Sequence, residues 1–480
     1  MTDSNSTTGD NKVSTSQARY NVTEIIDRSR LSGFQILVLL FCAAVAAADG
    51  FDTGIIGYVA PSMGAEWGLQ RTQLIPAFGA GLIGMMIGNL VFGLLADRFG
   101  RKTILIASVI VFSISSIASG LATNIEEIVA LRVLTGLGLG GAMPICLTLT
   151  SEYSPARLRM ILVTLSWMGF TGGLALGGVV AAWMVPTFGW RSLFYLGGAA
   201  PILLSLLLWR MLPESLAFLA LRPERREELV ATLHRIAIPQ AQIDQLDVQA
   251  PSASTPAQKS PIKDLFAGDF RAITPLLWCT FFCSLFVFYL LANWLPILLK
   301  SADFSIADAS RINAMLPLGG TLGSLVLALI MSRANPSGVL AVAYFLASLA
   351  LAAAGYWLHD MLAVMALVFM AGFLWIGGQN GINLLAASIY PTRIRATGVG
   401  WALGIGRAGA VIGSISGASL FAYANSTDRF LVAAAVPLAV AALAQFLMMR
   451  QPGANTTFGR PGAVKPDIGP ASRGTAEVGR

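Results

Sequence analysis

Charged residues are scarce in this sequence, and their scarcity first excludes a soluble protein. Only 12% of its 480 residues are Asp, Glu, Lys or Arg, against about 25% in soluble domains. Hydrophobic residues make up 55% of the chain, and the mean hydropathy is +0.69. The composition therefore indicates an integral membrane protein, although the length alone would suggest about three soluble domains.

Residues that bind metals are few as well. The two histidines, His234 and His359, lie outside the apolar runs, so proton transfer within a membrane would fall to carboxylates. Cys279 and Cys283 are four residues apart, with no second pair and no nearby histidine, which disfavours a zinc site or a disulfide. We expect no metal. A short apolar core of the kind found in signal peptides is also lacking before residue 33, so the first apolar run is expected to direct the chain to the membrane.

The apolar residues fall into runs of about 20 residues or more, the length that a membrane-spanning helix needs. These runs predict an all-α, polytopic membrane protein with twelve transmembrane helices. The helices are expected near residues 34–60, 74–95, 103–122, 128–150, 160–184, 191–212, 272–298, 309–331, 338–358, 361–388, 396–422 and 429–449.

One long polar segment, residues 213–271, divides the spans into an N-terminal half (34–212) and a C-terminal half (272–450). We expect this segment to be a linker with a surface helix near Arg222, and we expect the polar ends, 1–33 and 451–480, to be disordered. Of the 32 lysines and arginines, 25 lie on the side of the linker and both termini, and five lie on the other side. The positive-inside rule then places the linker and both termini in the cytoplasm. Because the basic residues are spread over short loops, we expect no nucleic-acid partner.

An internal repeat relates the two halves. Gly140-Gly141 precedes Tyr153 in the first half as Gly377-Gly378 precedes Tyr390 in the second, at the same spacing of thirteen residues. The repeat predicts two pseudo-symmetric six-helix halves that rock around a central site.

Two carboxylates, Asp49 and Asp52, interrupt the first span. An ionised Asp at the centre of a bilayer costs about 2.5–3.5 kcal/mol on insertion scales, so two of them require a function or a partner. Their spacing places both on nearly one helix face. We expect this face to line a polar cavity and at least one carboxylate to take up and release a proton. The structural alternative is a pair neutralised by a buried partner.

Two arginines lie inside spans and need anions, since arginine does not lose its proton. Arg132 is expected to pair with Asp49 or Asp52, or else to bind a substrate carboxylate. Arg407 should lie near the midplane, and no carboxylate in the second half can neutralise it there. An exogenous carboxylate is its expected partner, because guanidinium matches carboxylate bidentately. Backbone carbonyls or a first-half Asp are the alternative.

Aromatic and amide side chains accompany these arginines. An aromatic slot beside a cationic anchor suits a flat aromatic acid, although phenylalanines that face lipid would give a similar stripe. The predicted substrate-binding residues, besides the arginines, are Phe288, Tyr289, Trp375, Gln379, Asn380 and Asn383.

The loop Gly93-Leu-Leu-Ala-Asp97-Arg98-Phe-Gly100-Arg101-Lys102 resembles the loop signature of the major facilitator superfamily. Over about residues 20–450 the chain resembles the aromatic acid:proton symporters of that superfamily. The further motifs are Asp49-Gly-Phe-Asp52, Glu152-x-x-Pro155-x-Arg157-x-Arg159, Tyr390-Pro-Thr-x-Ile-Arg395 and Gly404-x-Gly406-Arg407-x-Gly409.

The resemblance implies proton-coupled import of a benzoate or hydroxybenzoate across a bacterial inner membrane, by a protein that functions as a monomer. Asp97 could accept hydrogen bonds from the N-terminus of a neighbouring helix or pair with Arg157 or Arg159, and the resemblance implies that this contact latches the outward-open state. The alternative is a solvated loop charge. The second-half loop Ser332–Asn335 lacks the corresponding acidic and basic residues, so gating should depend on the first-half copy. The implied gating residues are Gly93, Asp97, Arg98, Gly100, Arg101, Glu152, Arg157, Arg159 and Arg395.

No cofactor or enzymatic activity is expected. The glycines from Gly136 to Gly141 lie in an apolar span and follow no strand, so they favour helix packing over a dinucleotide-binding loop. The alternatives are a carrier of another organic acid or sugar, an exporter, or a receptor on the same fold. Pro213-Glu214-Ser215 resembles sugar carriers, but sugars need no cationic anchor.

Overall fold

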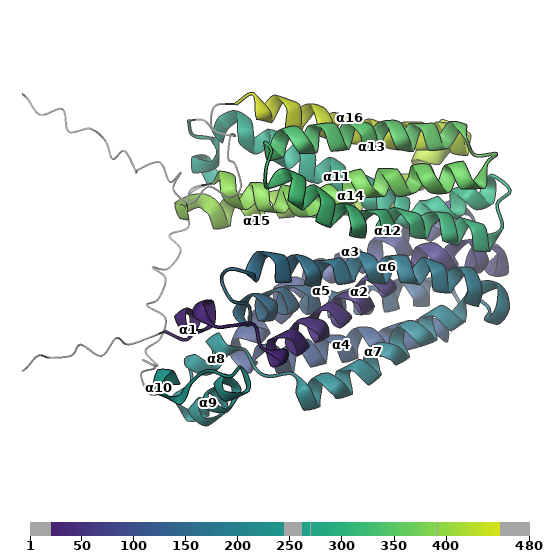
Figure 1. Ribbon diagram of the computed structural model, residues 1–480. Helices are drawn as coiled ribbons and strands as arrows, with labels where there is room; N and C mark the ends of the chain where they lie inside the picture. Colours follow the sequence, from purple (N-terminus) through teal and green to yellow (C-terminus); the bar gives the residue numbers. More distant parts are fainter. Residues whose placement is uncertain (1–20, 244–261, 269, 391, 452–480) are drawn as a thin grey trace, which may run out of the picture.

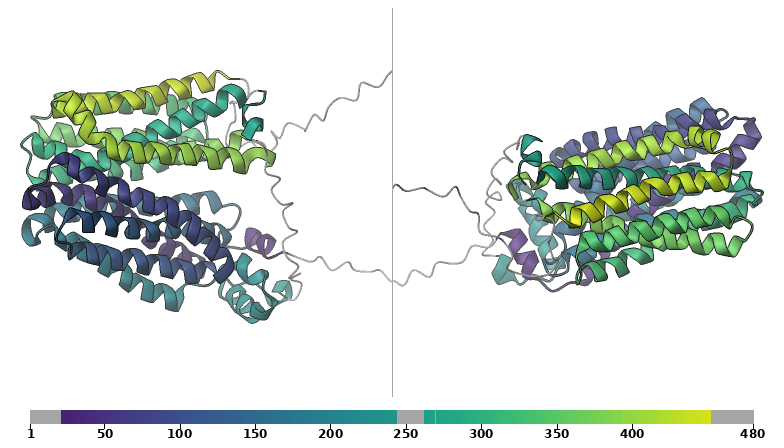
Figure 2. Two further views of the ribbon diagram at one scale, coloured as in Figure 1. Left: turned by 180° about the vertical axis from the view of Figure 1, so that it is seen from behind. Right: turned by 90° about the horizontal axis from the view of Figure 1, so that it is seen from above.

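The computed structural model describes residues 21–243, 262–268, 270–390 and 392–451, and every regular element in this part of the chain is a helix. Twelve of the described helices are long and apolar enough to cross a membrane, and they form two bundles of six (Figures 1 and 2). This confirms the predicted all-α fold with two halves. The first bundle contains α2 (Gly33–Trp67), α3 (Ile75–Phe99), α4 (Arg101–Gly120), α5 (Ile125–Glu152), α6 (Arg159–Phe188) and α7 (Arg191–Met211). The second contains α11 (Phe270–Ser301), α12 (Ile306–Met331), α13 (Pro336–Tyr356), α14 (Met361–Ile389), α15 (Thr392–Ala424) and α16 (Thr427–Met449).

The first span is longer than predicted. We expected it to end just before Pro61, but α2 continues through this proline to Trp67. Arg191 stabilises the extension by donating a hydrogen bond of 2.7 Å to Glu66 in its last turn. Gly68 then ends the helix at a φ of +64°, a left-handed conformation that glycine adopts without strain.

Short helices gather at one end of the first bundle, which we call the α8–α10 end (Figure 1). They belong to the segment between α7 and α11, where a linker with a surface helix was predicted. The elements of this segment at the first bundle are α8 (Leu216–Ala220), a 3-10 helix (Pro223–Arg225), α9 (Arg226–Arg235) and α10 (Gln240–Ile243). A further 3-10 helix, Ile262–Phe266, packs against α11 and α15 of the second bundle.

A further helix, α1 (Val22–Arg28), lies within the N-terminal segment that was predicted to be disordered. Val22, Ile25 and Ile26 bury their side chains, and the helix contacts α8. Asp27 forms an ion pair with Arg159 at the start of α6. The prediction was wrong here because three apolar residues in a polar segment give little signal until a partner surface covers them. Residues 1–20 and 452–480 lie outside the described part of the chain.

Glycines bring helix backbones together at equivalent places in the two bundles. Between α3 and α5, a Cβ on Gly136 would lie 2.0 Å from the carbonyl oxygen of Gly81. Between α12 and α14, a Cβ on Gly372 would lie 1.9 Å from the carbonyl oxygen of Leu316. These glycines therefore pack helices, as expected for small residues within a membrane.

Gly136→Ala is expected to destabilise the protein by about 1–3 kcal/mol, because its methyl group would force α3 and α5 apart. The measurement is the thermal unfolding midpoint of the purified protein in detergent. Gly172→Ala is the matched control, since a Cβ at Gly172 meets nothing within 4 Å. Equal midpoints for the two variants would contradict the close approach of α3 and α5.

The two bundles pack together mainly through α6 and α12, α2 and α11, and α3 and α15. Arg71 donates a hydrogen bond to Ser301, and Ser414 donates one to the carbonyl of Phe78, both nearer the end opposite α8–α10. We call this the far end. The ribbons of the two bundles diverge from there towards the α8–α10 end (Figure 1).

Candidate functional site

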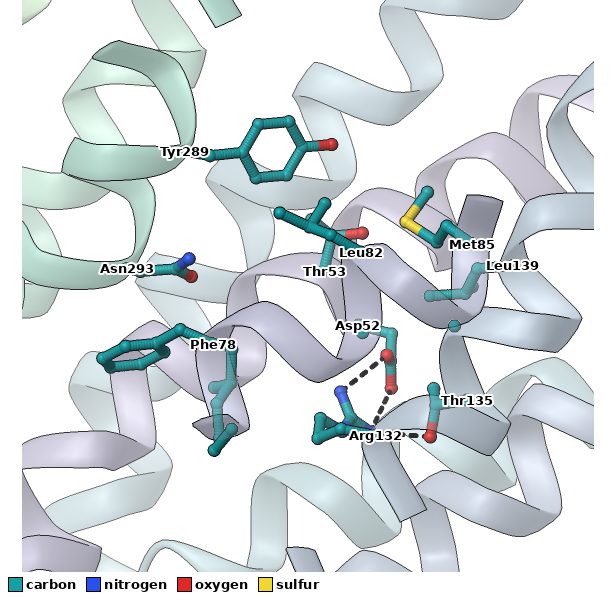
Figure 3. A pocket seen from close by; sticks show the side chains of 14 residues that line it. Asp52, Thr53, Phe78, Leu82, Met85, Arg132, Thr135, Leu139, Tyr289 and Asn293 are labelled. Atoms are coloured by element: carbon teal, nitrogen blue, oxygen red, sulfur yellow. Dashed lines mark hydrogen bonds and ion pairs between the residues drawn. The ribbon is translucent and has the colours of Figure 1, made fainter. Parts of the chain in front are cut away.

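Asp52 and Arg132 form a buried ion pair inside the first bundle. The Nη1 atom of Arg132, on α5, lies 3.0 Å from Oδ2 of Asp52, on α2 (Figure 3). Asp52 is 0% exposed and Arg132 is 4% exposed. Arg132 therefore pairs with a carboxylate of the first span, which was one of the two alternatives predicted for it.

Two hydroxyl groups that sequence analysis missed complete this pair. Ser116, on α4, donates a hydrogen bond of 2.7 Å to Oδ1 of Asp52, and Arg132 donates one of 3.0 Å to Thr135. Both oxygens of Asp52 thus have donors. The available signal was the group of serines in the apolar run 103–122, where buried hydroxyls need hydrogen-bond partners.

Asp49 lies one turn before Asp52 and is far less well satisfied. It is 0% exposed, and among the described residues its one hydrogen bond comes from the Thr53 hydroxyl, at 3.3 Å. Its Oδ2 atom has no hydrogen-bond partner among the described residues. An ionised carboxylate in such a place is strongly disfavoured, so the two neighbouring acids have different environments.

Arg407 projects from α15 in the other bundle and is half-buried. It makes no hydrogen bond or close ion pair with any residue that the structure describes. It lies within electrostatic range of Asp49 in the first bundle and of Tyr289 in the second. Asp49 is therefore within electrostatic range of Arg407, and a first-half Asp was one of the alternative partners predicted for this arginine. The hydrogen-bond donors of Arg407 have no partner among the described residues and are available to another anion.

Aromatic rings line the contact between the bundles near these charges. The ring of Phe288 lies 5.1 Å from that of Tyr289 and 6.4 Å from that of Trp375, between ring centroids. Phe170, on α6 of the first bundle, lies 6.5 Å from Phe288. The structure thus brings the predicted aromatic residues of α11 and α14 together and adds Phe170, which sequence analysis did not single out.

A polar cluster lies behind these rings, centred on Ser284 of α11. The Ser284 hydroxyl donates a hydrogen bond of 2.6 Å to Gln379 and accepts bonds from Trp375 and Tyr344. Asn383, one turn beyond Gln379, has a buried side-chain oxygen with no partner among the described residues. The side chain of Asn380 lies outside the described part of the structure.

A small cavity of about 30 Å³ lies between the two bundles, beside the ion pair (Figure 3). Asp52, Arg132 and Thr53 line it from the first bundle, and Tyr289 and Asn293 line it from the second. It has room for about one water molecule. An aromatic acid at this cavity would require the bundles to move.

The predicted gating loop between α3 and α4 is bound to the end of α5. Arg101 pairs with Glu152 and donates a hydrogen bond of 2.6 Å to Ser215, which donates one to the other oxygen of Glu152. Gly100 has a φ of +100°, and a Cβ there would lie 2.3 Å from the Glu214 carboxylate. Glycine is therefore required at this position.

Glu214 is a buried member of this network. Its role in the structure was not predicted from the sequence. Its carboxylate accepts hydrogen bonds of 2.9 Å from the backbone amides of Lys102 and Ser215. The hydroxyl of Tyr153 donates a bond of 2.6 Å to the Glu214 carbonyl. Burial raises the pKa of Tyr153, so its hydroxyl remains a neutral donor. These contacts join segments far apart in the sequence, which no local pattern reveals.

Asp97 does not make the contact considered for it. Its side chain is 76% exposed and its charged neighbour is Arg101, 3.8 Å away. Arg157 is exposed, and Arg159 is bound by Asp27 of α1, a helix that the sequence did not predict. In this conformation an ion pair of Asp97 with Arg157 or Arg159 is therefore absent.

The remaining predicted gating residues are dispersed. A Cβ on Gly93 would meet nothing within 4 Å. The carbonyl of Arg98 accepts a hydrogen bond of 2.6 Å from Arg222. Arg395 donates a hydrogen bond of 3.2 Å to the carbonyl of Tyr390, and in the first-half copy of this motif Arg159 donates one of 3.1 Å to the carbonyl of Ser151.

Comparison with known proteins identifies the family. A family model described as Major Facilitator Superfamily matches residues 42–414. The chain is 42% identical to a 4-hydroxybenzoate transporter, PcaK, of Pseudomonas putida, over 88% of this chain and 94% of the relative. It is 39% identical to a gallate transporter of Pseudomonas putida, over 89% and 94% of the two chains. It is 31% identical to a benzoate transport protein of Acinetobacter baylyi, over 82% and 85%.

Solved structures share the fold at lower identity. The inward open conformation of the xylose transporter XylE from E. coli matches with a TM-score of 0.67 and 17% identity, over 86% of this chain and 96% of that one. An inward-facing bacterial homolog to the human lysosomal transporter Spinster matches with a TM-score of 0.64 and 20% identity, over 88% and 98%. The chain thus belongs to the major facilitator superfamily, in its aromatic acid family, and is a membrane transporter and not an enzyme.

Proposed function

We propose that this protein is a proton-coupled symporter that imports a small aromatic carboxylate, such as benzoate or a hydroxybenzoate, by alternating access. The names of the relatives support the substrate class, since they include transporters of 4-hydroxybenzoate, gallate and benzoate. We further propose that it acts as a monomer in a bacterial inner membrane, with the α8–α10 end and both termini in the cytoplasm. The distribution of basic residues supports this orientation.

The observation that carries the proposal is the unequal pairing of four charged side chains. Asp52 and Arg132 form an ion pair within one bundle, whereas Asp49 and Arg407 belong to different bundles and lie within electrostatic range of each other, without a hydrogen bond between them. An intramembrane acid and an intramembrane arginine without close partners are typical of proton and substrate sites.

The two groups can couple proton and substrate by competition. An ionised Asp49 attracts Arg407 and so opposes the binding of a second anion. A proton on Asp49 removes this attraction, and the substrate carboxylate can then take the donors of Arg407 bidentately. The site carries the same total charge with Asp49 ionised and no substrate as with both the proton and the substrate bound. The transporter can therefore close around the site and reopen on the other side of the membrane in either of these two states.

The aromatic residues would hold the ring of the substrate. Phe288, Tyr289 and Trp375 lie beside one another and next to the bundle contact, and aromatic rings attract each other in stacked or edge-on arrangements. The amides of Gln379 and Asn383 would bind ring substituents. A sugar would leave Arg407 without an anion, which disfavours the alternative of a sugar carrier.

The test is uptake of labelled 4-hydroxybenzoate by proteoliposomes with an imposed inward proton gradient. We expect accumulation above the external concentration, and its collapse when an uncoupler is added. Benzoate and gallate should compete for uptake, whereas xylose should not. Accumulation only under an outward gradient would identify an exporter, and uptake that is insensitive to the uncoupler would contradict proton coupling.

A further inference from the structure

A second cavity lies at the far end, away from the charged site already described. It is a groove of about 340 Å³ between the end of α15 and a short 3-10 helix, Arg71–Leu74, that precedes α3. Its polar lining residues are Gln70, Arg71, Thr72 and Asn425, and its aromatic lining residue is Phe421. The volume falls within the range of about 300–1,000 Å³ found for small-molecule sites.

Of the described residues that line this groove, Arg71 is the one that carries a charge. Its guanidinium lies over the ring of Phe421, 4.0 Å from the centroid, and its Nη2 atom donates a hydrogen bond of 2.6 Å to Ser301. Arg71 belongs to the first bundle, and both of these partners belong to the second. No described residue forms an ion pair with Arg71.

Two other arginines at this end are neutralised, and a third, Arg429, is exposed. Arg191 lies 2.7 Å from a carboxylate oxygen of Glu66, and Arg311 lies 3.0 Å from one of Asp308. Arg71 therefore stands out as a half-buried cation in a groove, with an aromatic ring beside it and donors that no carboxylate occupies. This combination matches the two parts of an aromatic acid, an anionic head and a flat apolar ring.

We propose that this groove is an outer capture site for the aromatic carboxylate, occupied before the substrate reaches the central site. The inference rests on the proposed function. The carboxylate would bind the free edge of the Arg71 guanidinium, and the ring would lie against Phe421. Because Arg71 also ties the two bundles together through Ser301, a substrate that draws it away would loosen the contact at the far end. Capture and opening would then be one event.

The test is protection of a cysteine placed in the groove. Thr72 is exposed, and the native cysteines are buried or half-buried, so Thr72→Cys should be the site at which whole cells react with a membrane-impermeant maleimide. We expect 4-hydroxybenzoate to slow this labelling and the neutral 4-hydroxybenzamide to leave it unchanged. Adding Arg71→Gln should raise the half-protecting concentration by about tenfold to a hundredfold, the range for loss of a hydrogen bond to a charged group. Gln70→Cys serves as a second reporter if Thr72→Cys does not fold.

Two controls separate this inference from the proposed function. Arg407→Ala disables the central site, so protection that persists in Thr72→Cys with Arg407→Ala must arise in the groove. Arg191→Gln removes a neutralised arginine from the same end and should leave protection unchanged. The inference is overturned if 4-hydroxybenzoate gives no protection, if the benzamide protects equally, or if protection survives Arg71→Gln. None of these results would contradict the proposed function, which is tested separately by uptake in proteoliposomes.

Discussion

Asp49→Asn is expected to abolish accumulation of 4-hydroxybenzoate against its gradient while leaving exchange of internal for external substrate intact. Asparagine imitates the protonated acid, so it no longer competes with the substrate for Arg407, but it carries no proton across the membrane. The accumulation ratio in proteoliposomes with an inward proton gradient should fall to about one or below, since no proton then accompanies the anion. Counterflow of labelled substrate should continue at a rate similar to that of the unaltered protein.

Asp52→Asn provides the informative comparison. Removing one partner of a buried ion pair leaves Arg132 uncompensated and typically costs about 3–5 kcal/mol of stability. This variant should therefore lower the thermal unfolding midpoint and the amount of protein in the membrane, whereas Asp49→Asn should change neither by much. Asp308→Asn, in an exposed ion pair, controls for the loss of a carboxylate. Uphill accumulation by Asp49→Asn would show that Asp49 does not carry the proton.

Arg407→Ala is expected to abolish substrate binding while leaving the protein folded. Arg407 makes no hydrogen bond or close ion pair with the residues that the structure describes, so its loss breaks no bond of either kind among them. Bonds to charged groups contribute about 1.5–3 kcal/mol each, and losing two of them lowers affinity by about two to four orders of magnitude. Equilibrium binding of labelled 4-hydroxybenzoate to purified protein measures this change.

Arg407→Lys sharpens the test because it keeps the charge but loses the planar fork of donors. We expect at least about a tenfold weaker affinity for 4-hydroxybenzoate, with a loss smaller than that of Arg407→Ala. Arg333→Ala, which removes an exposed arginine from the loop after α12, is the matched control and should bind normally. If both Arg407 variants bound 4-hydroxybenzoate with unaltered affinity, Arg407 could not be the anchor for the carboxylate.

The bundle and its charged residues could be predicted from sequence because both depend on local composition. Twenty apolar residues in a row cross a bilayer whatever surrounds them, and a charge among them is conspicuous. The different surroundings of Asp49 and Asp52 could not be predicted. They depend on Ser116, Thr135 and Arg132, which come from other helices. These residues lie around Asp52 and form no hydrogen bond with Asp49.

The errors share a physical origin. α2 extends beyond Pro61 because Glu66 meets Arg191, more than 120 residues later in the chain. α1 exists because α8 covers its apolar face, and it occupies Arg159, which was one of the partners considered for Asp97. In each case a tertiary contact outweighed the local signal, and such contacts are invisible to hydropathy and motif spacing.

The ion pair between Asp27 and Arg159 fixes α1, near the beginning of the described chain, to the first bundle, while α16, at the end of the described chain, belongs to the second. Dyes attached next to α1 and after Met449 would thus report on opposite halves of the transporter. Energy transfer between them would follow the rocking of one half against the other during turnover, with no label inside the substrate path.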